Sequence, residues 1–204
     1  MFQDKNSLLK NLKSCNSVTL ELGCGNRKRF ENSIGIDMLD YPCVDIVGNL
    51  SEVLQAFPVG SVDRVTSHHV FEHLDDLEGM LMKLARILKP GGQLEIVVPH
   101  FSNPYYFSDA THKSFFGLYT LCYFSSQSPF VRQVPSYQRQ LNFEFVTVDL
   151  MFKSAKPFYL RYGFKRFFGY FFNLNKYTQE LYEENFCYIF PCYELRYVLR
   201  RIKS

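Results

Sequence analysis

The stretch Val18–Asn26 reads V-T-L-E-L-G-C-G-N and decides the fold. Its short apolar run meets two glycines, Gly23 and Gly25, and an acid, Glu21, stands just before them. Glycines at the end of a strand let the backbone turn tightly and approach a ligand with no Cβ in the way. A second apolar run, I-G-I-D, ends in Asp37, where a carboxylate can accept both hydroxyls of a ribose. The two runs predict a nucleoside cofactor at the edge of a parallel sheet.

Two classes of cofactor fit a glycine turn that is followed by a ribose acid. A dinucleotide is typically bound by G-x-G-x-x-G, and Lys28 occupies the position of the third glycine. An acid directly before G-x-G is not part of that fingerprint. It suits S-adenosyl-L-methionine (SAM), because the amino-acid end of SAM is cationic and a carboxylate such as Glu21 attracts it. The residues therefore favour SAM, and a nicotinamide dinucleotide is the alternative.

Composition predicts a single globular domain over residues 1–204, of which 47% are apolar. The six cysteines form no C-x-x-C pair and no spacing typical of zinc, so we expect reduced thiols and no metal. The acids Glu72, Asp75 and Asp76 lie at an expected helix start, where acids are favoured anyway. The N-terminal M-F-Q-D-K-N has no apolar h-region, and no run of about 18 apolar residues could span a membrane. We expect a cytoplasmic protein.

Strand and helix patterns alternate from residue 17 to residue 98. Leucines at helical spacing precede Lys89-Pro90-Gly91-Gly92, which is a strong helix end. Repeated β-α units with right-handed crossovers give a Rossmann-like sheet that binds ligands at the C-terminal ends of its strands. Between the first two strands, residues 26–32 form a short basic segment in place of a long helix. The expected strands are 17–22, 34–37, 44–47, one beginning at 64–67, and 93–98, and the expected helices are 4–16, 51–57 and 75–88.

The motifs E-L-G-C-G, G-I-D, S-H-H-V-F-E-H-L and L-K-P-G-G-Q-L-E-I-V-V-P follow one another in residues 17–99. In this order they resemble the motifs of class I SAM-dependent methyltransferases. The resemblance implies that Glu21 lies near the methionine amine, that Gly23 and Gly25 form the cofactor turn, and that Asp37 holds the ribose. It also implies that Asn49 and Leu50 meet the adenine, although Asn49 equally suits a helix N-cap. Ser67 and His68, at the end of the fourth strand, complete the expected cofactor set.

Residues 100–140 are expected to form an aromatic-rich insertion on the substrate side, with a helix at Ser114–Tyr123 capping the pocket. Residues 141–204 are expected to hold a last antiparallel pair of strands, 141–152 and 193–202, and a helix over Thr178–Phe190. This would complete the seven-stranded, mostly parallel sheet that the resemblance implies, with a cofactor half at about 17–99.

The five histidines all fall between residues 68 and 112. O-methylation needs a base poised near neutrality, and histidine is the first suspect. His69 and His100 follow the fourth and fifth strands, and the insertion carries D-A-T-H, with Asp109 and His112. The segment D-A-T-H-K-S-F-F resembles small bacterial methyltransferases that are often encoded with surface-polysaccharide genes. The candidate catalytic residues are therefore His69, His100, Asp109 and His112, and the sequence leaves open which histidine is the base.

The C-terminal quarter is basic. Residues 151–204 contain 10 Lys and Arg against 4 Asp and Glu, whereas residues 1–150 contain 13 against 16. The segment Lys156–Phe172 mixes cations with aromatic residues, which suits the surface of an anionic bilayer. We expect peripheral contact with a lipid-linked glycan carrier as one possibility. No base-reading motif follows the fourth strand, so nucleic acid is not an expected partner, and the oligomeric state is not specified.

The sequence thus predicts a SAM-dependent methyltransferase that acts on the oxygen of a sugar or related polar molecule in cell-surface glycan synthesis. Two alternatives stay open. A non-catalytic SAM-binding partner subunit would fit the short segment that replaces the first helix. An NAD(P)-dependent oxidoreductase would fit the glycine turn, but the chain lacks the third glycine and a Y-x-x-x-K pair after the fourth strand.

Overall fold

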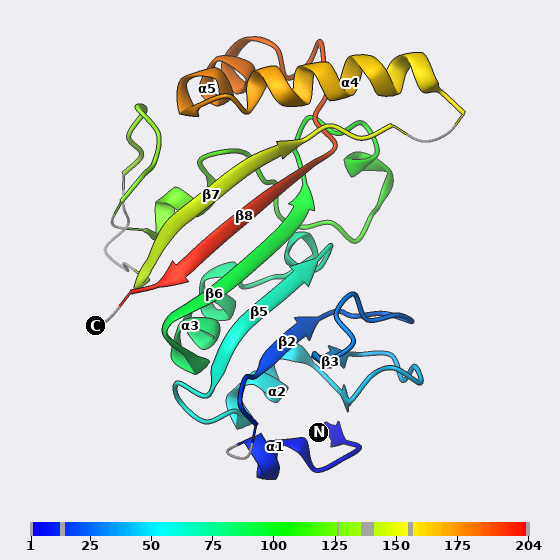
Figure 1. The fold of residues 1–204 in the computed structure, drawn as a ribbon, viewed down its shortest axis with the longest axis vertical. Helices are drawn as coiled ribbons and strands as arrows, with labels where there is room; N and C mark the ends of the chain where they lie inside the picture. Colours follow the sequence, from blue (N-terminus) through cyan, green and yellow to red (C-terminus); the bar gives the residue numbers. More distant parts are fainter. Residues whose placement is uncertain (1, 13–14, 126, 136–140, 155–156, 203–204) are drawn as a thin grey trace.

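The protein is an eight-stranded sheet with most of its helices on one face (Figure 1). The computed structural model describes residues 2–12, 15–125, 127–135, 141–154 and 157–202. The strand order is β1-β4-β3-β2-β5-β6-β8-β7. The strands are β1 (Gln3–Asp4), β2 (Thr19–Leu22), β3 (Ile34–Asp37), β4 (Ile46–Val47), β5 (Val62–His68), β6 (Leu88–Pro99), β7 (Phe143–Met151) and β8 (Glu194–Arg201).

The five strands from β2 to β6 pair in parallel, as the alternating pattern predicted. Strand β8 runs antiparallel to both β6 and β7, so the predicted antiparallel final strand is confirmed. The prediction of seven strands missed β1, a two-residue edge strand that pairs with β4. The expected helix over residues 4–16 was too long, because Gln3 and Asp4 join the sheet and, among the described residues of this segment, the α-helix α1 covers Leu8–Asn11.

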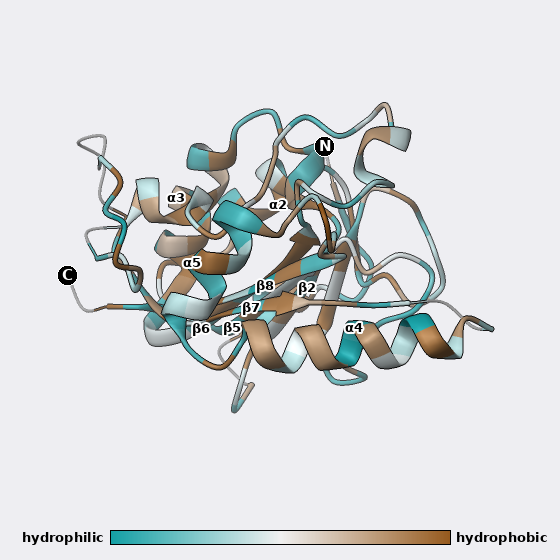
Figure 2. Cartoon of the chain, turned by 90° about the horizontal axis from the view of Figure 1, so that it is seen from above, coloured by the Kyte–Doolittle hydropathy of each residue, from teal (hydrophilic) through white to brown (hydrophobic). Residues whose placement is uncertain are grey.

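Helices α2 (Leu50–Ala56) and α3 (Leu77–Ile87) cover one face of the sheet, together with α5 (Lys176–Asn185), and Figure 2 shows all three on the same side. Asn49 and Asp76 begin α2 and α3, because each side chain accepts a hydrogen bond from a backbone amide of the first turn. The buried face of α3 packs Leu81 and Leu84 onto the strands. Each such leucine stabilises the fold by about 1.5–3 kcal/mol.

The opposite face of the sheet has no helix over β2, β5 and β6 in the described part of the chain, and this face is polar. The loop between β2 and β3 takes the place of a helix there, as the short basic segment predicted. On this face Arg64 and Arg196 both bond the carboxylate of Glu95, at 2.6 and 2.8 Å. The ring of Phe30, from the loop, lies 5.0 Å below the guanidinium of Arg64. The missing helices are thus compensated by ion pairs rather than by apolar packing.

The insertion after β6 contains short 3-10 turns, at Tyr106–Ser108 and Thr120–Phe124, and no α-helix in its described residues. The predicted helix at Ser114–Tyr123 was wrong. Tertiary hydrogen bonds hold its backbone instead: the Gly117 carbonyl accepts from the Tyr197 hydroxyl, and the Leu118 amide donates to Glu183.

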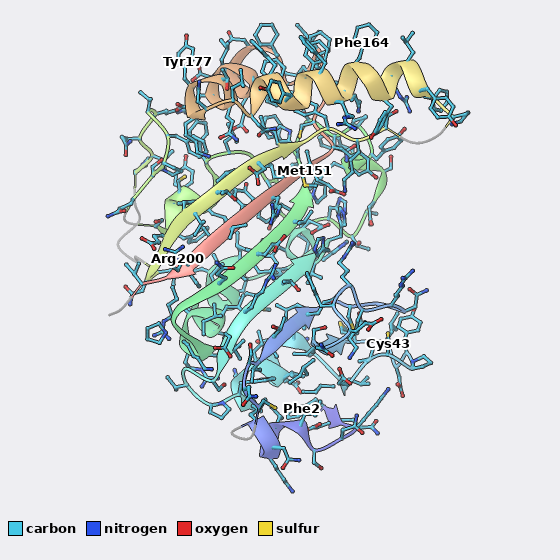
Figure 3. All side chains as sticks on the ribbon, in the orientation of Figure 1. Phe2, Cys43, Met151, Phe164, Tyr177 and Arg200 are labelled. Carbon is cyan, nitrogen blue, oxygen red and sulfur yellow. The ribbon has the colours of Figure 1, made fainter. Side chains whose placement is uncertain are left out.

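Helix α4 (Tyr159–Phe172) lies beyond the end of β7, and helix α5 follows it in the chain after a short turn. Figure 3 shows Met151 at the end of β7 and Phe164 on α4, outside the sheet. Phe172 is the buried residue of α4, and the helix is largely apolar on its exposed sides (Figure 2). None of the helices in the described ranges is long and apolar enough to cross a bilayer.

Candidate functional site

The glycine turn lies at the C-terminal end of β2. Gly23 and Gly25 have φ values of +63° and +60°, a region that residues with a Cβ enter only at a cost. The Gly25 amide donates to the carboxylate of Asp37 at 2.8 Å, and the Leu39 amide donates to its other oxygen at 2.9 Å. Asp37 therefore fixes the turn and ends β3 beside it. The structure brings together the two glycines and the acid that were predicted to hold a nucleoside.

Glu21 lies next to this turn but points into the loop between β2 and β3. It is 3% exposed and accepts hydrogen bonds from the amides of Arg29 and Phe30 and from the hydroxyl of Ser33. Its carboxylate therefore closes the loop that replaces a helix. The role predicted for Glu21 at the methionine amine stays a prediction, and the loop contacts are a function that the sequence did not indicate.

The other expected cofactor residues occupy the neighbouring strand ends. Asn49 is exposed and caps α2 through a bond from the Ser51 amide at 2.9 Å, and Leu50 is half-buried behind it. Ser67 is fully buried in register with Leu22. The role predicted for Ser67 at the cofactor stays a prediction. Burial and the charge of Arg29 lower the pKa of the neighbouring His68 to about 4, which keeps this imidazole neutral.

His69 directly follows β5 and has a left-handed backbone conformation, with φ at +55°. Such backbone strain is common at functional sites. Its Nε2 lies 3.0 Å from Glu194 and its Nδ1 lies 3.1 Å from Glu72. These two hydrogen bonds raise the pKa of His69 to about 9, so the ring is a cation at neutral pH. Its protonated state favours an ion-pairing role for His69 over that of a general base.

His100 is fully buried, and the structure does not bring it to a surface that a substrate could reach. Its Nδ1 accepts from the Ser102 amide at 3.0 Å, and its Nε2 lies 3.2 Å from a carboxylate oxygen of Glu183. Both ring nitrogens are therefore occupied within the core. This arrangement makes His100 a link between β6 and α5.

His112 lies on the insertion, where its Nδ1 donates to the Tyr106 carbonyl at 2.9 Å. Asp109 approaches its Nε2 at 3.6 Å, too long for a hydrogen bond, and binds Thr111 instead, at 2.8 Å to the amide and 2.6 Å to the hydroxyl. The carbonyl of Tyr106, rather than Asp109, therefore orients this imidazole. The ring of His112 packs 4.9 Å from that of His73.

A cavity of about 730 Å³ opens beside the His69–Glu194 pair. Glu194 lines it and also pairs with Lys153. Arg161 and Lys165 of α4 face it from the other side. Burial and the nearby charge of Arg161 lower the pKa of the Lys165 ammonium. The cavity thus presents three cations and one carboxylate at the ends of the strands.

Several residues of this site were not predicted from the sequence, because they belong to no recognisable motif. Glu194 and Lys153 belong to the C-terminal strand pair, and Glu72 stood at an expected helix start. The signal for Glu194 was present, since it is an acid at the start of the apolar strand E-L-R-Y-V-L. Nothing in the sequence paired it with a histidine far away at residue 69, because that contact depends on the register between β6 and β8.

Residues 8–96 match the family model "Methyltransferase domain". This part, less than half of the chain, is similar to methyltransferase domains. It contains the glycine turn, Asp37 and strand β5, and the match supports the predicted class of enzyme. No curated protein matches the chain.

The fold of this chain recurs in solved structures. A SAM-dependent methyltransferase from Archaeoglobus fulgidus is 17% identical with a TM-score of 0.58, and the match covers 96% of this chain and 90% of that one. A SAM-dependent methyltransferase from Mesorhizobium loti is 14% identical with a TM-score of 0.52 and 98% coverage of both chains. Phosphoethanolamine N-methyltransferase 2 from Haemonchus contortus, in complex with SAM, is 15% identical with a TM-score of 0.52 over 97% of this chain and 52% of that one. These similarities confirm the predicted α/β fold.

Proposed function

We propose that this protein transfers the methyl group of SAM to an oxygen of an anionic sugar derivative or related polar molecule. S-adenosyl-L-methionine is the methyl donor: the part of the chain that is similar to methyltransferase domains contains the glycine turn, and the turn is fixed by the acid suited to a ribose. Phosphoethanolamine N-methyltransferase 2 from Haemonchus contortus, a structural neighbour, was solved in complex with SAM. The donor would lie over Gly23 and Gly25, with its ribose at Asp37 and its adenine toward Asn49 and Leu50.

The observation that carries the acceptor class is the charge of the cavity beside His69. Lys153, Arg161 and Lys165 outnumber its one acid, Glu194. Guanidinium and ammonium groups bind phosphate and carboxylate oxygens by charge-assisted hydrogen bonds. A sugar that carries a phosphate or a carboxylate therefore suits the cavity better than a neutral sugar.

The transfer itself needs alignment more than covalent help. The acceptor oxygen attacks the methyl carbon, the carbon–sulfur bond breaks with its electron pair on sulfur, and S-adenosylhomocysteine is released. The oxygen becomes strongly acidic as the new bond forms, so a carboxylate can take its proton even when it is a weak base. We assign this role to Glu194, which His69 and Lys153 hold in place. Asp109 and His112 would then act from the insertion, on the substrate side.

The membrane contact that was predicted for Lys156–Phe172 is part of this proposal. Lys156 lies outside the described residues. Along α4, Leu160, Phe164 and Tyr170 are 79%, 58% and 74% exposed, which is unusual for apolar side chains of this size. An apolar groove of about 580 Å³ runs along the same helix and shares Arg161 and Lys165 with the cationic cavity. This continuity fits an acceptor whose anionic group is joined to a hydrocarbon chain, such as a lipid-linked glycan.

Titration calorimetry with S-adenosylhomocysteine, NAD and NADP tests the donor. We expect S-adenosylhomocysteine alone to bind, and Asp37→Ala to weaken it at least about 10-fold, since two backbone amides and the ribose lose their acceptor. Asp40→Ala is the matched control, because Asp40 is a nearby exposed acid that pairs with Lys5 at the surface. Binding of a dinucleotide instead would refute the proposal.

Turnover tests the acceptor. We expect the full chain to convert SAM to S-adenosylhomocysteine with an anionic glycolipid fraction, and Glu194→Gln to lower kcat more than KM. Lys165→Gln should instead raise KM, because Lys165 lines the cavity away from the His69 pair. Flotation with anionic vesicles tests the membrane contact, and a Phe164→Ser variant should float less. Binding of S-adenosylhomocysteine without turnover of any acceptor would favour the non-catalytic alternative.

A further inference from the structure

Three side chains from two distant segments of the sequence come together next to the His69–Glu194 ion pair. Glu72 and His73 belong to the 3-10 helix Phe71–His73 that follows β5, and His112 comes from the insertion. One ligand atom from each residue lies within 4.8 Å of those of the other two. The backbone holds the two segments together, since the Lys113 amide donates to the Glu72 carbonyl at 2.7 Å.

Both imidazoles are fixed through Nδ1. His112 Nδ1 donates to the Tyr106 carbonyl at 2.9 Å. His73 Nδ1 lies 2.9 Å from the Thr111 hydroxyl and 3.3 Å from the Thr111 carbonyl. The Thr111 hydroxyl donates to Asp109, so it accepts from His73. A carbonyl can only accept, hence each Nδ1 carries a proton and each Nε2 is left with a lone pair. Histidines that bind metals through Nε2 show this pattern of outer hydrogen bonds.

Glu72 supplies the negative charge. The residue is fully buried, and its Oε1 bonds His69. Its Oε2 is shielded from solvent and has no hydrogen-bond partner. A buried carboxylate oxygen without a partner is costly, and native proteins seldom leave one so. A hydrogen-bond donor or a cation would satisfy this oxygen.

The surroundings of His112 lead to the same requirement. The Oδ2 atom of Asp109 lies 3.6 Å from His112 Nε2. A carboxylate this close to an imidazole nitrogen favours a cation at that nitrogen, either a proton or a metal ion. A proton would satisfy His112 alone, whereas a metal ion would satisfy His112, His73 and Glu72 at once.

We propose that Glu72, His73 and His112 bind a divalent transition-metal ion, with Zn²⁺ as the natural occupant. Two imidazoles and one carboxylate form a His₂Glu set, which leaves a further coordination position for water or another ligand. The ion would join the insertion to the end of β5. Through the second oxygen of Glu72 it would also hold His69 against Glu194. The sequence predicted no metal because its ligands follow no zinc spacing.

Metal binding by the tag-free full chain tests this directly and does not depend on methyl transfer. After removal of metal with a chelator, Co²⁺ is added as a spectroscopic probe, and Zn²⁺ is titrated in competition with a chelator of known affinity. We expect one equivalent of Co²⁺ to give d–d bands that Zn²⁺ abolishes. His73→Ala and His112→Ala should each weaken binding about 100-fold or more, since losing even an outer partner costs 10- to 100-fold.

Asp75→Asn is the matched control, because Asp75 lies in the same segment and pairs with Lys113 on the surface. It should bind Co²⁺ as the unmodified chain does. A melting temperature that rises with Zn²⁺ in the unmodified chain, and does not rise in His112→Ala, separates lost binding from lost folding. The proposal would be overturned if no Co²⁺ bands appeared or if both histidine variants bound Co²⁺ as tightly as the unmodified chain. Charge-transfer absorption from thiolate to Co²⁺ would also overturn it, because the ligands would then be cysteines.

Discussion

The glycine turn offers the sharpest test of how this sequence specifies its fold. Gly23 and Gly25 have nearly the same positive φ, but their surroundings differ. A Cβ on Gly23 would lie 2.3 Å from the Cγ2 atom of Val70, whereas a Cβ on Gly25 would meet nothing within 4 Å. Replacing each glycine by alanine therefore separates backbone strain from steric overlap.

The magnitudes follow from these two effects. Alanine in the left-handed region costs about 1–2 kcal/mol, and we expect Gly25→Ala to lose that much. Gly23→Ala should lose the same amount plus about 1–3 kcal/mol for overpacking against Val70. Total stabilities of domains are commonly 5–15 kcal/mol, so both variants should still fold.

Urea unfolding measures the difference, provided that the slope m is unchanged. The double variant Gly23→Ala/Val70→Ala removes the overlap and should recover the overpacking part, which appears as a coupling energy between the two sites. Equal losses in Gly23→Ala and Gly25→Ala, or no coupling with Val70, would refute the reasoning.

Three further predictions concern stability. Burial opposes ionisation of Glu95, but hydrogen bonds from Arg196 and Arg64 outweigh it and lower the pKa of its carboxyl. The ionised Glu95 therefore stabilises the fold above the pKa that it has in the unfolded chain, and this stabilisation is lost as pH falls through its pKa in the folded protein. The difference in free energy of unfolding between the unmodified chain and Glu95→Gln should shrink below about pH 4. Asn49→Ala should lose about 0.5–2 kcal/mol in urea unfolding and Asn49→Ser much less, since serine also caps helices; equal losses would contradict the cap. Leu84→Ala should lose about 2–5 kcal/mol, because Leu84 is fully buried, and a loss under 1 kcal/mol would contradict its place in the core.

The sequence predicted well wherever neighbouring residues determine the structure. Helix α3 is set by leucines at helical spacing, and a Pro-Gly-Gly run follows it. Strand β3 occurs at Ile34–Asp37 as predicted, since a short apolar run between turns has one stable pairing in a parallel sheet. Ser114–Tyr123 failed because Gly117 and Leu118 bond distant partners, Tyr197 and Glu183, which no local pattern contains.

By itself the sequence determined the alternation of strands and helices from β2 to β6, the glycine turn and its acid, because each depends on residues within one β-α unit. Only the tertiary structure decided the charge state and the contacts of each histidine. The register of β8 on β6 places Glu194 beside His69 and makes that ring a cation. Folding of the insertion onto the end of β5 brings His112 to Glu72. The charge of a side chain and the set of ligands around a metal ion depend on such contacts between distant segments. A local sequence pattern does not specify which distant residues will be in contact.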